Sequence, residues 1–177
     1  MSLLSNLQLM SQYNQWMNQK IYQAAKDLGD EEIKQDRGAF FDSILGTLNH
    51  IYIADIIWLR RFTRHPNQYQ SLQDLPELSS YTNLKAIAAD NIEDLSALRQ
   101  KLDEIIINWC REIEPKDLES NLQYSDTKNN PYCKNFGQLI HNLFNHQTHH
   151  RGQASTLFSQ QKIDLGVTDF LKFLPER

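Results

Sequence analysis

The segment NHQTHHRGQ, residues 145–153, holds three of the six histidines of the chain. Two of them, His146 and His150, are four residues apart. Because each residue turns an α-helix by about 100°, their side chains would stand about 40° apart around a helix and roughly 6 Å apart along it. This spacing allows two imidazoles to bind one metal ion. His141 and His149 would point in other directions, and we expect neither to be a ligand.

A third candidate ligand is His50, at the end of the segment TLNH. In a helix over residues 40–63 it would share an apolar stripe with Gly46, Ile53 and Ile57, so that its imidazole would face the protein interior. Taken alone, such a histidine is more often a core residue with a satisfied hydrogen bond than a ligand.

The pair His146 and His150 favours a metal more strongly than His50 does alone. Burying an unpaired polar group costs about 1–3 kcal/mol, and one divalent ion would satisfy both rings at once. The segment lacks the glutamate of the HExxH motif, which supplies the general base of zinc proteases. The sequence therefore indicates a metal site but not protease chemistry.

Four amphipathic segments could position these histidines, because apolar residues recur in each at every third or fourth position. They cover residues 3–28, 40–63, 84–110 and 135–161. Gly29 offers a left-handed stop for the first segment, and Asn135 followed by Gln138 resembles a capping box that opens the last. A four-helix bundle is the simplest way to bury four apolar stripes. We therefore predict an all-α four-helix bundle in a single domain over residues 1–177.

Two connections are expected to be irregular. Residues 65–81, HPNQYQSLQDLPELSSY, contain two prolines and many polar residues, which is typical of a long loop. Residues 115–134 include the turn-rich TKNNP, which predicts a short hairpin or an ordered loop before the last long helix.

Composition narrows the class of protein. The chain has 18 basic and 22 acidic residues and no block of like charge, so we expect no nucleic-acid partner. Cys110 and Cys133 form no CxxC pair, which suits a reducing compartment. Neither a signal peptide nor an apolar run long enough for a membrane span is recognisable. We expect a cytoplasmic protein that does not bind membranes.

Several segments, in this order along the chain, resemble the DinB-like family of damage-inducible and YfiT-type four-helix bundles. The resemblance is carried by YNQWMNQKIYQAA at residues 13–25, FFDSILGTLNHIYIADIIWLRRF at 40–62, HNLFNHQTHHRGQ at 141–153 and LGVTDFLKFL at 165–174. It implies a divalent metal held by His50, His146 and His150. Nickel and zinc are both found in similar proteins, and imidazole ligands suit either ion. The resemblance also implies a homodimer.

Three protein ligands would leave at least one coordination position for a substrate, as catalytic sites do. The resembled family includes bacillithiol S-transferases and a mycothiol-dependent maleylpyruvate isomerase. The resemblance therefore implies a metal-dependent transferase that joins a low-molecular-weight thiol to a small-molecule substrate. Two alternatives stay open: a metal-dependent hydrolase, which would need no thiol, and a non-catalytic metal-binding stress-response protein. The sequence identifies no catalytic residue beyond the candidate ligands.

Other residues near these motifs lead to smaller expectations. Asp55 interrupts an apolar stripe and needs a partner, for which Arg151 is a candidate, and a role in supporting a ligand or contacting the substrate stays open. Gln153 could orient a histidine ligand through a hydrogen bond or contact the substrate. Gly152 costs about 1 kcal/mol relative to alanine in a helix, which indicates a close helix approach or room beside the metal. We expect Cys133 to play no part in the site.

Overall fold

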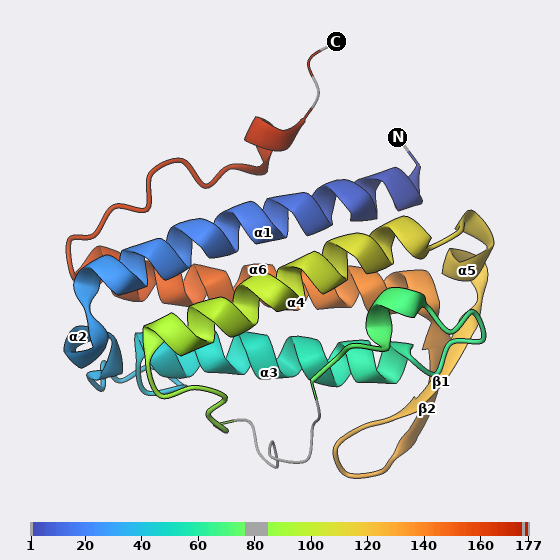
Figure 1. The fold of residues 1–177 in the computed structure, drawn as a ribbon, viewed down its shortest axis with the longest axis horizontal. Helices are drawn as coiled ribbons and strands as arrows, with labels where there is room; N and C mark the ends of the chain where they lie inside the picture. Colours follow the sequence, from blue (N-terminus) through green and yellow to red (C-terminus); the bar gives the residue numbers. More distant parts are fainter. Residues whose placement is uncertain (1, 77–84, 175, 177) are drawn as a thin grey trace.

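Within residues 2–76, 85–174 and 176, which the computed structural model describes, four long helices form a bundle (Figure 1). They are α1 (Leu3–Leu28), α3 (Ile44–Phe62), α4 (Ile92–Glu112) and α6 (Phe136–Gln160). As Figure 1 shows, α1 and α6 run in one direction and α3 and α4 in the other. Helix α6 packs against both α1 and α3, and α4 packs mainly against α1. The predicted all-α four-helix bundle is confirmed.

Short elements complete the fold. They are α2 (Asp30–Lys34), α5 (Pro115–Glu119), the strands β1 (Asn121–Ser125) and β2 (Pro131–Asn135), and 3-10 helices at Gln70–Leu72 and Phe170–Phe173. The two strands pair in antiparallel register from Asn121 opposite Asn135 to Ser125 opposite Pro131, which confirms the predicted hairpin. Helices α2 and α5 were not predicted, because five residues are too few to show a helical period.

The ends of the first two long helices follow from local capping. Ser2 caps α1, and Gly29, at φ 87°, follows its last residue as expected. Helix α3 begins at Ile44, capped by Ser43, so the predicted start at residue 40 is four residues too early. The residues before it form a tight turn in which Asp42 has φ 64°, a conformation that a helix cannot contain.

Helix α4 begins at Ile92 rather than near Leu84, which lies outside the described residues. The cause is a long-range contact from α3. The Asn49 side chain accepts a hydrogen bond from the Ala88 backbone at 2.7 Å and donates one to the Ala89 carbonyl at 3.0 Å. These bonds hold the chain in a non-helical path until Asn91 caps the helix.

The connection from α3 to α4 is long, as predicted, and its residues 77–81 lie outside the described residues. Its first part is anchored by His65, which stacks on Phe136 with ring centroids 4.5 Å apart. The His65 Nε2 atom lies 3.0 Å from the Ser120 hydroxyl, next to the hairpin. This buried histidine therefore holds the connection in place.

The last described segment returns along the outside of α1 (Figure 1). The Tyr13 hydroxyl donates a hydrogen bond to the Thr168 carbonyl at 2.6 Å, and the Tyr13 ring packs edge-on against Phe170. Among the described residues, no helix combines the length and the hydrophobicity needed to cross a membrane.

Candidate metal centre

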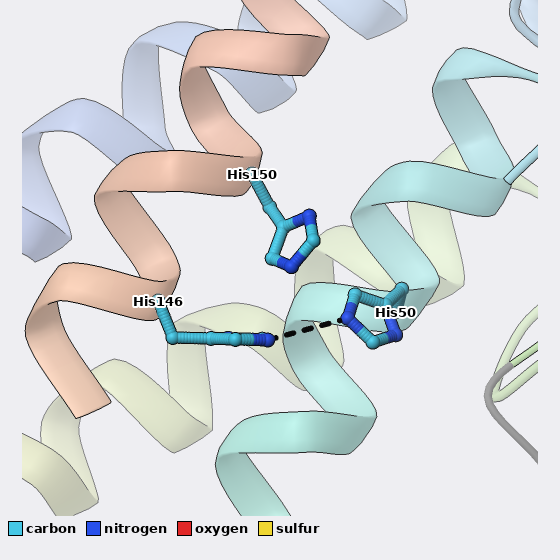
Figure 2. A group of neighbouring side chains, drawn as sticks. All are labelled: His50, His146 and His150. Carbon is cyan, nitrogen blue, oxygen red and sulfur yellow. Dashed lines mark hydrogen bonds between the residues drawn. The ribbon is translucent and has the colours of Figure 1, made fainter. Parts of the chain in front are cut away.

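Helices α3 and α6 bring His50, His146 and His150 together (Figure 2). The Nε2 atoms of His50 and His146 are 3.3 Å apart. A ring nitrogen of His150 points toward the space between them, and one nitrogen from each residue lies within 4.8 Å of the other two. Within the described part of the chain, these three histidines form the one group of potential metal ligands whose ligand atoms lie close enough to share an ion. The sequence prediction that these three histidines meet is confirmed.

The spacing of the nitrogens fits a metal ion. Two imidazole nitrogens bound to zinc at about 2.0–2.1 Å with a tetrahedral angle would lie about 3.3 Å apart. The separation between His50 and His146 has this value, and the ligand nitrogen of His150 lies within 4.8 Å of both. The residues present therefore fit a divalent cation.

The protonation state of the histidines also favours binding of a metal cation. Burial, together with His150 and His50, lowers the pKa of His146 to about 3. Burial lowers the pKa of His150 as well, although the hydrogen bond that its Nδ1 donates to Gln153 acts in the opposite direction. Both rings are therefore neutral at pH 7, and a neutral imidazole is the form that binds a metal.

Gln153 fixes the orientation of His150. Its side-chain oxygen lies 2.7 Å from His150 Nδ1, so this nitrogen donates a hydrogen bond and Nε2 is left as the ligand atom. The Gln153 amide nitrogen lies 3.3 Å from His149 Nε2, which places His149 beside the cluster rather than in it. His149 and His141 are both exposed. The expected hydrogen bond between Gln153 and a histidine of the cluster is confirmed, and His141 and His149 lie outside the cluster.

Phe41 forms an aromatic wall against the cluster, which the sequence did not predict. Its ring stacks on His50, with centroids 3.9 Å apart and an angle of 17° between the ring planes. It also makes an edge-to-face contact with the His150 ring, with centroids 5.5 Å apart. The predicted helix over residues 40–63 would include Phe41 and turn its side chain into the core. Its position in the turn before α3 turns the ring toward the histidines.

Asp55 has a different partner from the one predicted. The buried carboxylate of Asp55 forms a salt bridge with Arg99 on α4 at 2.6 Å and accepts a hydrogen bond from Gln147 on α6 at 2.7 Å. The proposed pair with Arg151 is wrong, because α4 supplies a guanidinium to the same side of α3. Gln147 follows His146 directly, so this bond joins α3 to α6 beside the histidine cluster.

Arg151 belongs to the same buried polar network but contacts α1. It donates a hydrogen bond to Asn14. Asn14 and Asn18 both donate to Asp103, at 3.4 and 2.9 Å, and Asp103 forms a salt bridge with Arg99 at 2.9 Å. The network therefore runs through all four long helices.

Two further expectations have different outcomes. Gly152 is exposed, and a Cβ built on it would meet nothing within 4 Å, so the predicted close helix approach is wrong. Cys133 is exposed on β2, where it lines a hollow with Arg64 and Tyr132 and not with the histidines. Its expected absence from the cluster is confirmed.

Comparisons with known proteins place the chain in a family. The model of the DinB family matches residues 1–171. The Protein DinB of Bacillus subtilis (strain 168) is 27% identical over 163 residues, which cover 92% of this chain and 90% of that protein. The crystal structure of a DinB-like protein from Bacillus cereus ATCC 10987 has the same fold, with a TM-score of 0.62 and 18% identity over 93% of this chain and 94% of that one. The chain belongs to the DinB family.

Proposed function

We propose that the chain is a metal-dependent transferase that joins a low-molecular-weight thiol to a small electrophile. His50, His146 and His150 would hold the divalent cation, either nickel or zinc. The observation that carries the proposal is the convergence of three imidazole nitrogens within 4.8 Å of one another. When bound, such a cation lowers the pKa of a coordinated thiol, so that a thiolate nucleophile exists at neutral pH.

The protein supplies orientation and access. Gln153 holds the His150 ring with one nitrogen turned toward the cluster, and Phe41 stacks against His50. His146 and His150 are partly exposed, so a small molecule can reach them from solvent. Three protein ligands leave room for one that the substrate provides.

Thiol chemistry suits this site better than hydrolysis does. Asp55 is the buried carboxylate on α3, and it is engaged by Arg99 and Gln147 instead of facing the histidines. Water activation commonly uses a nearby general base, whereas a thiol has a pKa much closer to neutrality and loses its proton with less help.

In the proposed reaction, the thiol proton goes to solvent and a sulfur–carbon bond forms. The bond from that carbon to its leaving group breaks, and the leaving group takes the electron pair.

The test is turnover of 1-chloro-2,4-dinitrobenzene with each of several thiols: cysteine, coenzyme A, glutathione and bacillithiol. We expect a metal-dependent rate with at least one thiol, which falls to background in His150→Ala. The matched control is His141→Ala, an exposed histidine on the same helix, which should keep the parent rate. Metal binding without a metal-dependent rate for any thiol would contradict the proposal and favour a non-catalytic role.

A further inference from the structure

A cavity of about 260 Å³ lies between the turn that precedes α3 and the segment that precedes α4. Small-molecule sites usually measure about 300–1,000 Å³ and are largely apolar, so this cavity suits a small ligand. Its apolar walls are Phe41, Leu45 and Ile87. Ile87 is 52% exposed, and Phe40, whose ring packs edge-on against Phe41, is 68% exposed. Both side chains therefore present apolar surface that a ligand could cover.

Phe41 connects this cavity to the histidine cluster. The histidines do not line the cavity, but Phe41 does, and the Phe41 ring stacks on His50 with centroids 3.9 Å apart. A molecule in the cavity would therefore lie next to a residue that contacts the cluster directly.

The turn that carries Phe41 is firmly held. The Phe41 carbonyl accepts a hydrogen bond from the Ser43 backbone at 2.7 Å, and the Asp42 carbonyl accepts one from Arg37 at 2.7 Å. A Cβ on Gly46 would lie 2.1 Å from the Phe41 carbonyl oxygen, so a glycine is required for α3 to approach this turn. The cavity wall is therefore preformed rather than assembled around a ligand.

The charged side chains at the cavity favour neither sign of ligand. Lys34 and Lys85 are balanced by Asp42 and Asp90, and all four are exposed. Lys85 and Asp42 form a salt bridge with each other at 2.8 Å. An anionic ligand would gain from the lysines and lose by a similar amount from the carboxylates, whereas an uncharged ligand avoids both effects.

We propose that this cavity binds an uncharged electrophile with a small aromatic or other apolar body. This inference rests on the proposed function, in which such a molecule is the second substrate. Phe41, which lines the cavity and contacts His50, is then the residue shared by the electrophile site and the histidine cluster. Ile87 and Leu45 provide the apolar contacts that select the ligand.

Binding of 1,3-dinitrobenzene, an uncharged and unreactive aromatic probe, tests the cavity without any turnover. Equilibrium dialysis against the full chain as purified would measure its dissociation constant, with 3,5-dinitrobenzoate as the anionic counterpart. We expect Ile87→Ser to weaken binding of 1,3-dinitrobenzene by about tenfold, because one apolar contact in a pocket has an effect of this order. Ile87→Leu should bind as the parent does. Val167→Ser is the matched control, since Val167 is 48% exposed and does not line the cavity.

Failure of the cavity proposal is distinguishable from failure of the proposed function. Absence of binding, equal binding by the parent and Ile87→Ser, or tighter binding of 3,5-dinitrobenzoate than of 1,3-dinitrobenzene would each overturn the cavity proposal, even if thiol transfer is observed. Binding that Ile87→Ser weakens and Val167→Ser does not would support the cavity, even if no thiol gives turnover.

Discussion

At the scale of single residues, His146 shows how the site is prepared for a cation. The rings of His150 and His50 lie within 4.3 and 5.2 Å of it, between centroids. Burial and these neighbours keep its pKa near 3, so a proton is a poor competitor for the ring at neutral pH. Each of the three neutral rings can offer the lone pair of one nitrogen to a divalent cation.

Gln153→Leu tests the orientation of His150. This change removes the acceptor that lies 2.7 Å from His150 Nδ1 and leaves the ring free to turn. We expect metal affinity to fall by about 10–100-fold, as is usual when the hydrogen-bond partner of a ligand histidine is lost. Competition with a chromophoric chelator would measure the affinity.

Two further variants complete this test. Gln153→Glu keeps an acceptor at the same place and should retain most of the affinity. Gln160→Leu changes an exposed glutamine on the same helix and should have no effect. An affinity for Gln153→Leu equal to that of the parent would show that Gln153 does not orient the ligand.

Part of the site could be predicted from single residues and part could not. The spacing of His146 and His150 fixes their common face on any helix, so the pair was predictable from helical geometry. The stacking of Phe41 on His50 depends on a turn in which Asp42 adopts a positive φ, and no residue in FFDS makes that conformation obligatory.

At the scale of elements, a buried network sets how the helices face one another. Asp55 on α3 and Asp103 on α4 are both 3% exposed or less, and both are bound by Arg99. Burial raises the pKa of each carboxyl, and the Arg99 guanidinium acts against this shift. Because Gln147 also donates to Asp55, the network fixes the rotation of α6 that presents His146 to His50.

Arg99→Met tests the contribution of this network to stability. The substitution leaves two buried carboxyl groups without their cation, and breaking a buried ion pair in this way costs about 3–5 kcal/mol. We expect the free energy of unfolding, measured by urea denaturation, to fall by that amount. Arg111→Met, at an exposed position near the end of the same helix, should change it by less than about 1 kcal/mol. Equal stability of Arg99→Met and the parent would contradict the role given to the network.

The sequence predicted the helices better than their contacts. Periodicity located all four long helices, since each buries a continuous apolar stripe. It failed at the start of α4, because Asn49, some forty residues earlier, binds the backbone at Ala88 and Ala89. It also failed for the partner of Asp55, since the choice between Arg99 and Arg151 depends on which helix lies nearest.

At the scale of the whole molecule, the bundle joins two helices that are distant in sequence into one site. His50 and His146 are 96 residues apart, and the packing of α3 against α6 makes them neighbours. The long connection between α3 and α4 lets these helices run in the same direction, so that α6 can lie antiparallel to α3 (Figure 1). A single domain over residues 1–177 and a homodimer stay predictions.

The metal content of the protein purified without an affinity tag tests the central claim most directly. Elemental analysis should find about one nickel or zinc ion per chain in the parent. It should find almost none in the triple variant His50→Ala, His146→Ala and His150→Ala. The double variant His141→Ala and His149→Ala, which removes two exposed histidines, should keep the ion. A parent without bound metal, or a triple variant that retains it, would contradict the account.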